Sequence, residues 1–394
     1  MKLVIMLGDG MADHPIKVLG EKTPLEVAET PYMDRMAKEG CGGYALNVPQ
    51  GMPPGSDVAN LSVMGYDPRQ YYSGRAPLEA AAMNVSLKEN DVAFRCNLVN
   101  VDLEKGTMVD YSAGHISTEE TRGLITSLQD ICSEGRLYPG VSYRNLLVLN
   151  GLAEKAECTP PHDIMDMPIE DHMPRGEGAS ILREMMDASV PILKNHPINR
   201  RRDSQGKRPA NMIWLWGQGK TPSMPKFETM RGIRGAVISA VDLLKGIGVY
   251  AGFEVIDVPG ATGVLDTNYE GKAQAALEAL ERVDFVYLHV EAPDEMGHDG
   301  KLDKKIEAIR RFDARIVGPV LKGLEGSGYE WRACVLPDHP TPVALRTHTS
   351  EPVPFAMMGA SIEADKMEHF SERDAAQGSL GQIEGHKLMN LMMK

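Results

Sequence analysis

The sequence contains few cysteines, and their spacing does not pair them. Its 394 residues include five cysteines, an odd number, and no two of them form a Cys-x-x-Cys motif. This pattern fits reduced thiols in the cytoplasm better than a disulfide framework. Long hydrophobic runs are also missing: the first run, Leu3–Leu7, stops at Gly8, and no later stretch reaches about 18 apolar residues. We therefore expect a cytoplasmic protein with no membrane partner.

Positive charge is scarce as well. The formal net charge is -13, which argues against nucleic acid or an acidic membrane as a partner, because phosphate binding needs a basic surface. A small anionic substrate is still allowed, since a site needs only local positive charge from a metal ion, Arg or Lys. Complete nucleotide motifs are absent too. Gly217–Lys220 is rich in glycine and follows a strand-like run, but it lacks the spacing of a Walker loop or a dinucleotide fingerprint.

The chain is long enough for two domains. Alternating helix and strand patterns at both ends predict an α/β core, whereas the middle of the chain indicates a separate α+β unit. We place the core at residues 1–83 and 209–394 and the inserted unit at 84–208. A helical pattern is expected over Ala236–Lys245. Three short apolar runs are typical of buried parallel strands: Lys2–Leu7, Phe285–Val290 and Trp331–Leu336.

Carboxylate and imidazole side chains follow each of these three runs. Asp9 follows the first run, Asp294 and His298 follow the second, and Asp338, His339 and His348 follow the third. Open α/β sheets place their ligand sites at the carboxyl ends of the strands. Each residue alone could cap a turn or lie in a surface loop, but three strand ends with the same chemistry predict a metal site. Imidazole nitrogen and carboxylate oxygen together suit Zn or Mn.

Ser56 stands where a Gly/Pro-rich loop runs into a helical pattern. Two interpretations share this geometry. As a helix N-cap, its oxygen would accept a backbone N–H bond and do nothing else. As a nucleophile, its oxygen would be deprotonated by a bound metal ion, and the helix amides would stabilise a phosphate attached to it.

The middle block carries the densest positive charge of the chain. It is either a solvated face or a clamp for phosphate or carboxylate, for which bidentate Arg is well suited. The residues concerned are His115, Arg144, Arg200, Arg201, Arg202, Lys207 and Arg208.

Taken in order, five motifs resemble those of the cofactor-independent phosphoglycerate mutases. They are the DGM, GSDVAN, DEMGHDG, PDHP and THTSEPVPF stretches around Asp9, Ser56, Asp294, Asp338 and His348. The resemblance spans nearly the whole chain and is greatest to the archaeal-type branch of that family, within the alkaline phosphatase superfamily. It implies a three-layer αβα alkaline-phosphatase-like core with an inserted α+β domain that binds the substrate.

The resemblance also implies a site and a reaction. Ser56 would carry the phosphoryl group between 3-phosphoglycerate and 2-phosphoglycerate, without 2,3-bisphosphoglycerate as a cofactor. Two divalent ions would be bound, usually Mn and sometimes Zn, Co or Mg. One would use Asp294, His298 and His348, and the other Asp9, Ser56, Asp338 and His339. Contacts to phosphoglycerate would come from His115 and Arg144, with Arg200 and Arg208 as further candidates.

Two alternatives remain open at this stage. Trp214–Gly219 and the run Arg200–Arg202 resemble a bacterial subgroup of the same branch that has been proposed to act as a homoserine kinase. Such an enzyme would keep the metals and Ser56 but would take phosphate from a donor such as ATP. The other alternative is a non-catalytic metal-binding protein, which would not need Ser56 at a helix start beside the ligands. The oligomeric state is not predicted.

Overall fold

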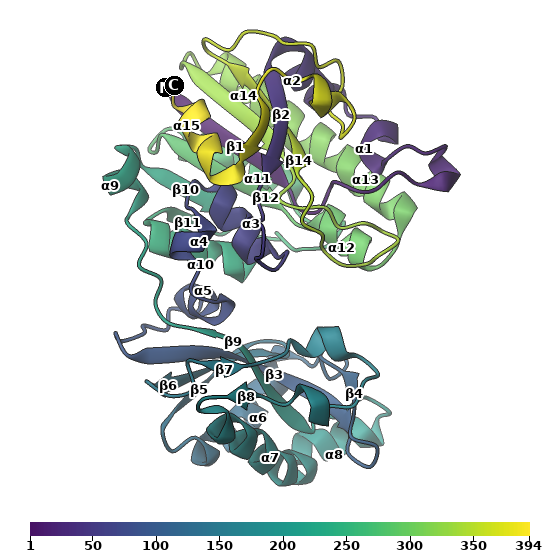
Figure 1. Cartoon of the computed structure of the whole chain (residues 1–394), viewed down its shortest axis with the longest axis vertical. Coiled ribbons are helices and arrows are strands. Elements are labelled where there is room, and N and C mark those ends of the chain that lie inside the picture. Colours follow the sequence, from purple (N-terminus) through teal and green to yellow (C-terminus); the bar gives the residue numbers. More distant parts are fainter. The chain divides into compact units, whose positions relative to one another are not determined.

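The computed structural model describes all 394 residues, which form two compact units (Figure 1). Unit 1 comprises residues 1–72 and 223–394, and unit 2 comprises residues 73–222. The boundaries expected from the sequence, at 84 and 208, therefore lie inside unit 2. The reason is local: α5 (Arg75–Ala82) packs on the sheet of unit 2, and β9 (Met212–Gly219) pairs with β3 (Asp91–Asp102) of that sheet.

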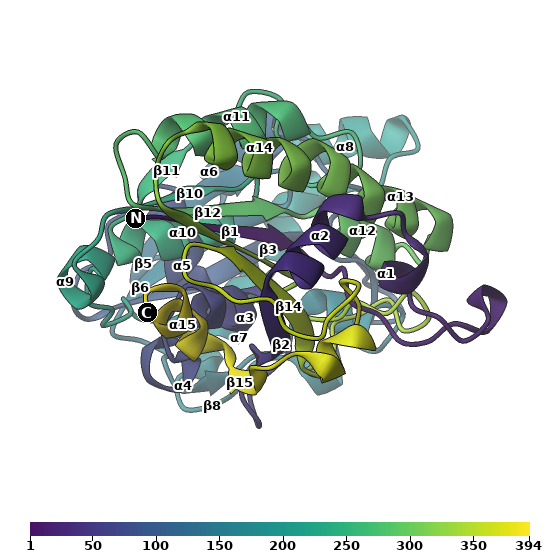
Figure 2. The same cartoon turned by 90° about the horizontal axis from the view of Figure 1, so that it is seen from above.

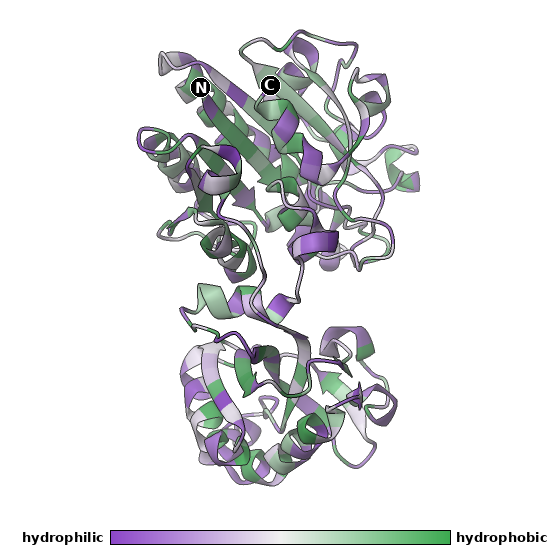
Figure 3. Cartoon of the chain, turned by 60° about the vertical axis from the view of Figure 1, so that its left-hand side comes forward, coloured by the Kyte–Doolittle hydropathy of each residue, from purple (hydrophilic) through white to green (hydrophobic).

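Unit 1 is built on an eight-stranded sheet in the order β11-β10-β12-β1-β13-β14-β2-β15. Its centre is β1 (Lys2–Gly8), which runs parallel to β12 (Phe285–Val290) on one side and to β13 (Trp331–Leu336) on the other. These are the three strands expected from the apolar runs, and Figure 3 colours the central strands mainly hydrophobic. The outer strands are β10 (Gly235–Ile238), β11 (Glu254–Ile256), β14 (Val353–Gly359), β2 (Cys41–Leu46) and β15 (Gly381–Glu384).

Helices cover both faces of this sheet, which gives the expected three layers (Figure 2). One face carries α2 (Pro31–Glu39), α11 (Tyr269–Ala279), α13 (Leu302–Phe312) and α14 (Gly318–Gly326). The other carries α3 (Ser56–Val63), α10 (Asp242–Ala251) and α15 (Leu388–Met392). Shorter helices are α1 (Pro24–Val27), α4 (Pro68–Tyr71), α9 (Phe227–Arg231) and α12 (Ala292–His298).

The start of one expected helix of unit 1, at Ala236, is wrong. Residues 235–238 form β10 instead, and α10 begins only at Asp242. Val237 and Ile238 are β-branched and fully buried between two neighbouring strands, a setting that favours the extended backbone over the first turn of a helix.

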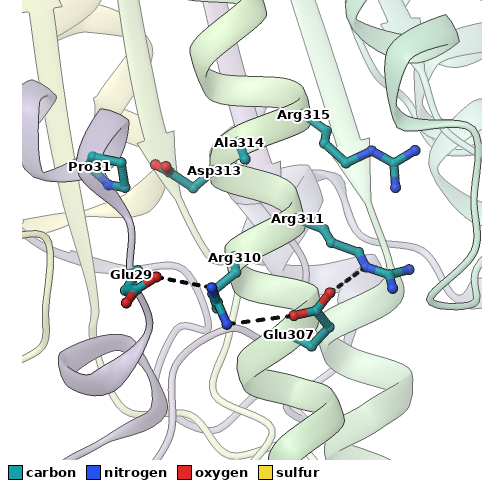
Figure 4. Close-up of a pocket in the computed structure, with 8 residues that line it drawn as sticks. All are labelled: Glu29, Pro31, Glu307, Arg310, Arg311, Asp313, Ala314 and Arg315. Carbon is teal, nitrogen blue, oxygen red and sulfur yellow. Dashed lines mark hydrogen bonds and ion pairs between the residues drawn. The ribbon is translucent and has the colours of Figure 1, made fainter.

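The start of α2 is capped from another helix. Thr30 stands at the N-cap position but makes no capping hydrogen bond with its side chain. The buried Asp313 carboxylate accepts the backbone N–H groups of Tyr32 (3.3 Å) and Met33 (2.7 Å) instead. Asp313 is the first residue of a π-helical turn that follows α13, and it lines a surface cavity of about 360 Å³ (Figure 4). In this cavity Arg310 pairs with Glu29 and Glu307, and Arg311 pairs with Glu307.

Unit 2 is an α+β fold with its own hydrophobic core. Its five-stranded antiparallel sheet contains the path β4-β3-β6-β5, and β9 also pairs with β3. Ser117 and Glu120 form a capping box at the start of helix α6 (Thr118–Ser127). Besides β3 and β9, the sheet contains β4 (Thr107–Asp110), β5 (Gly135–Val141) and β6 (Arg144–Asn150). A small hairpin of β7 (Ala156–Glu157) and β8 (Arg175–Gly176) and the helices α6 (Thr118–Ser127), α7 (Ala179–Asn195) and α8 (Pro197–Ser204) complete the unit. No helix of the chain combines the length and apolar character that crossing a bilayer demands.

Candidate functional site

The carboxyl ends of β12, β1 and β13 lie side by side and bring the predicted ligands together. Their potential ligand atoms form two groups, and within each group the atoms lie within 4.8 Å of one another. The first group is Asp294, His298 and His348, and the second is Asp9, Asp338 and His339. The groups are adjacent, because the rings of His339 and His348 have their centroids 4.0 Å apart.

In the first group, backbone carbonyls fix the protonation of both rings. His298 Nδ1 lies 3.0 Å from the carbonyl oxygen of Arg346, and His348 Nδ1 lies 3.2 Å from that of Pro54. A carbonyl only accepts, so each Nδ1 carries a proton, and in the neutral form of each ring Nε2 presents a lone pair. These two Nε2 atoms are 2.9 Å apart and lie 3.2 and 3.4 Å from the carboxylate oxygens of Asp294. A shared cation or proton is needed to hold them together.

Electrostatics in the first group reflect the same requirement. Burial alone would raise the pKa of Asp294, but the charge of His348 and the hydrogen bonds from both imidazoles hold it well below its ordinary value. Burial lowers the pKa of His298, yet the hydrogen bond to Asp294 and its charge raise it to about 9. A positive charge is therefore strongly favoured between these three side chains.

In the second group, two carboxylates are buried against each other. Asp338 Oδ1 accepts the backbone N–H groups of Gly10 and His339, and its Oδ2 accepts Asn60 Nδ2 at 2.7 Å. Asp9 Oδ1 is buried and has no hydrogen-bond partner. Burial and the charges of Asp338 and Asp294 raise the pKa of Asp9 well above its ordinary value. Neutralising this pair requires a proton or a cation.

Ser56 faces the second group. Its Oγ lies 3.1 Å from His339 Nε2, which is itself 3.6 Å from Asp9 Oδ1 and 3.4 Å from Asp338 Oδ2. Ser56 is the first residue of α3, and Gly55 occupies the N-cap position without any side-chain capping bond at this helix. The oxygen of Ser56 is therefore turned to the ligand group and does not cap the helix.

The two groups fit divalent cations by their donor set. Each offers a mixture of carboxylate oxygen and imidazole nitrogen, which Zn²⁺ and Mn²⁺ accept. The buried, unpartnered Asp9 Oδ1 and the two part-buried Nε2 atoms that face each other are polar atoms that a cation would satisfy.

Sequence reasoning missed several residues that hold this site. Asn60 donates to Asp338 Oδ2 and to the carbonyl oxygen of Ser56 (2.8 Å), and its own Oδ1 accepts the hydroxyl of Tyr287. Thr341 Oγ1 donates to Asp294 Oδ1. The spacing of Asn60 four residues after Ser56, on one helix face, is a signal that could have found it.

Unit 2 brings some of the predicted substrate contacts together. The ring of His115 and the guanidinium of Arg144 both lie beside Tyr143, with the ring centroids 6.2 Å apart and the guanidinium 5.5 Å from the Tyr143 ring. Arg208 is ion-paired with Asp110 at 2.6 Å. Arg200 lies on the exposed side of α8, where it contacts Asn195. Within the same basic run, Arg202 is buried against Glu120 and serves the fold.

A larger basic and aromatic cluster of unit 2 was not foreseen. Arg95 is 3% exposed, stacks on Trp216 at 4.6 Å and pairs with Glu79 at 2.9 Å, and Arg75 shares both partners. Burial lowers the pKa of Arg95 to about 10, so it stays charged at neutral pH. Ring contacts link Trp216 through His162 and Tyr111 to Tyr143. Together with His115 and Arg144, these residues are called the basic–aromatic cluster below.

Comparisons with known proteins show the family of this chain. A family model described as 2,3-bisphosphoglycerate-independent phosphoglycerate mutase matches residues 37–199. A relative of that name from Methanothrix thermoacetophila is 59% identical over the whole of both chains. A solved structure from Pyrococcus horikoshii is 32% identical with a TM-score of 0.83, covering 100% of this chain and 96% of that one. The cofactor-independent phosphoglycerate mutase of Thermoplasma acidophilum is 26% identical with a TM-score of 0.66, covering 100% and 99%. The chain therefore belongs to the family of 2,3-bisphosphoglycerate-independent phosphoglycerate mutases.

Proposed function

We propose that this chain interconverts 3-phosphoglycerate and 2-phosphoglycerate through a phosphoserine at Ser56. The observation that carries the proposal is the position of the Ser56 oxygen, 3.1 Å from His339 Nε2 at the first turn of α3 and beside two adjacent groups of metal-ligand side chains. Membership of the mutase family supports the same reaction. No 2,3-bisphosphoglycerate is needed, because the phosphoryl group rests on the protein between the two half-reactions.

The candidate metal ligands form two sets, one for each cation. When bound, two divalent cations would stabilise charge on the phosphoryl oxygens and lower the pKa of the Ser56 hydroxyl. Asp294, His298 and His348 would hold one of them, and Asp9, Asp338 and His339, together with the Ser56 oxygen, the other. The positive end of the helix dipole at the start of α3 would help to stabilise a phosphate on Ser56. The donor set favours Mn²⁺ or Zn²⁺ among the divalent ions.

The reaction balances in two steps. In the first, the bond from phosphorus to the Ser56 oxygen forms, the bond to the C3 oxygen of the substrate breaks, and the serine proton ends on that C3 oxygen. In the second, the C2 oxygen takes the phosphoryl group, and its proton returns to Ser56. Between the steps the free glycerate must stay bound. The basic–aromatic cluster of unit 2 suits a carboxylate by its charge, because it contains Arg75, Arg95 and Arg144, of which Arg75 and Arg95 pair with its one glutamate, Glu79.

Replacing the nucleophile tests the proposal. Ser56→Ala should abolish formation of 2-phosphoglycerate from 3-phosphoglycerate, measured by ³¹P NMR at saturating Mn²⁺, where the six remaining ligand side chains keep the bound metal content the same. The matched control is Ser62→Ala, which removes a fully buried, unpartnered hydroxyl from the same helix and should keep full activity. Mass spectrometry of the wild type quenched in acid should find the phosphate on the peptide that contains Ser56.

Two results would contradict the proposal. One is full mutase activity in Ser56→Ala. The other is an enzyme that leaves 3-phosphoglycerate untouched but forms phosphohomoserine from homoserine and ATP, which would make it a kinase that uses the same metal-bearing core.

A further inference from the structure

A buried histidine stands directly behind the second ligand group. His289 is the fifth residue of β12, is 0% exposed, and pairs with Leu7 of β1 in the register of the sheet. Its Nε2 lies 2.8 Å from Asp9 Oδ2, and its Nδ1 lies 3.1 Å from the hydroxyl of Ser239, which follows β10. Ser239, His289 and Asp9 thus come from the carboxyl ends of three neighbouring parallel strands, β10, β12 and β1.

The direction of this hydrogen-bonded chain is fixed by Asp9, because the ionised carboxylate of a metal ligand can only accept a hydrogen bond. The backbone N–H of Val241 donates to the Ser239 oxygen at 2.9 Å. The serine proton is then free to point at His289, whose Nδ1 accepts it. Because Nε2 faces the carboxylate, it carries the ring proton and donates to Asp9 Oδ2, and Nδ1 of the neutral ring accepts from Ser239.

This donation settles which oxygen of Asp9 faces the ligand group. Oδ2 is occupied by the imidazole, whereas Oδ1 is buried, has no partner, and lies 3.6 Å from His339 Nε2. The donor is a neutral ring. A Lys or Arg in its place would neutralise Asp9, but a neutral N–H orients the carboxylate and leaves its negative charge for a cation. The one nearby ammonium, Lys272 Nζ, donates to the backbone carbonyl of His289 at 3.0 Å.

We propose that Ser239 and His289 form a positioning device that holds Asp9 as a one-oxygen ligand for the cation of the second group. The proposal rests on the metal-binding role given to Asp9 in the proposed function. His289 touches no substrate and acts only through Asp9. Hydrogen-bonding partners behind metal ligands typically change metal affinity by about 10- to 100-fold when removed.

The test titrates Mn²⁺ into the metal-stripped, full-length chain by calorimetry and resolves the two binding events. In His289→Leu, the event that depends on Asp9 should weaken by about 10- to 100-fold, while the event that depends on Asp294, His298 and His348 stays unchanged. His289→Gln should recover most of the lost affinity, because its amide nitrogen can donate to Asp9 in the place of Nε2. Ser239→Ala should weaken the same event by a smaller factor, because the proton on the ring is no longer confined to Nε2.

The chain offers a matched control in Ser189. Its oxygen accepts the backbone N–H of Ile213 at 3.1 Å and donates to the carbonyl of Met186, so it is a buried serine with the same bonding as Ser239 but far along the chain in unit 2. Ser189→Ala should leave both Mn²⁺ affinities unchanged. Should His289→Leu fail to fold, the comparison of Ser239→Ala with Ser189→Ala decides the question by itself.

The proposal is overturned if His289→Leu binds both ions like the wild type, or if His289→Gln is as weak as His289→Leu. Equal weakening of both events would also overturn it, since that indicates a general loss of structure. Absence of any Mn²⁺ binding by the wild type is a different result, because it removes the metal site of the proposed function before the variants are compared.

Discussion

Lys305 offers a direct test of how the two ligand-bearing loops are held. Its ammonium is 0% exposed in α13 and donates to three acceptors: Asp13 Oδ2 at 2.8 Å and the backbone carbonyls of Ala12 and Thr341 at 3.0 and 2.8 Å. Residues 9–13 follow β1 and residues 337–343 follow β13, so one side chain ties both loops together. Burial lowers the pKa of Lys305, but the neighbouring Asp13 carboxylate favours its charged form.

Replacing Lys305 by Met keeps the volume and removes the charge. The Asp13 carboxylate, whose side chain is 1% exposed, then stays buried without its counter-ion. Breaking a buried ion pair from one side costs about 3–5 kcal/mol, and we expect Lys305→Met to lower the free energy of unfolding of unit 1 by that amount. The double variant Asp13→Asn/Lys305→Met should be more stable than Lys305→Met, because no buried charge is left unpaired.

Hydrogen exchange measured by mass spectrometry on peptides from β1 and β13 reports the stability of unit 1 separately from unit 2. EDTA keeps the chain free of metal, so that ligand binding adds nothing to the measured stability. Lys38→Met is the control, because Lys38 forms an exposed pair with Glu368 at 3.8 Å and its loss should change little. A double variant that is less stable than Lys305→Met would refute the reasoning, since the cost could not then come from the unpaired Asp13.

Two further predictions concern pH and backbone geometry. Burial raises the pKa of Asp313 to about 7, so the folded chain holds this proton more tightly than the unfolded chain; its contribution to stability is full below about pH 4 and is lost as the pH rises through 7. Burial also raises the pKa of Glu372 to about 7, so Asp313→Asn should remove only part of this loss of stability with rising pH. A urea midpoint of unit 1 that falls as steeply with pH in the variant as in the wild type would contradict the prediction. Gly10→Ala would place a Cβ 2.5 Å from Thr341 Oγ1 and 2.6 Å from Asp294 Oδ1 and should weaken Mn²⁺ binding in a calorimetric titration. Gly20→Ala has the same left-handed backbone with no atom within 4 Å, so equal Mn²⁺ affinities in the two variants would show that strain alone, and not the contact with Asp294, is responsible.

The candidate ligand residues could be found from the sequence because each follows a recognisable buried strand. Asp9, Asp294 and Asp338 need only the rule that parallel strands expose ligands at their carboxyl ends. That β1 lies between β12 and β13 is set by pairing over very long separations, which local patterns do not encode. Only the structure could exclude the capping role of Ser56, because a capping serine and a nucleophile occupy the same place at a helix start.

What the sequence could not show are the contacts behind the ligands. His289 lies within an apolar run, where a single polar residue gives no sign that it reaches Asp9, 280 residues away in the chain. The boundaries predicted at 84 and 208 differ from the observed limits of unit 2, residues 73 and 222, for a similar reason. β9 reads as an ordinary strand that could join either sheet, and its pairing with β3 depends on contacts across more than a hundred residues.

The central place of β1 has a consequence for how the protein is made. Leu3 pairs with Phe285, so at about 5–20 residues per second the ribosome needs roughly 15 to 60 s to supply the first partner of this strand. Throughout that time the apolar segment Leu3–Leu7 has no sheet to join, while unit 2 can complete its own core. Newly made chains are therefore expected to depend on chaperone protection of their first strand, and slower translation should increase aggregation.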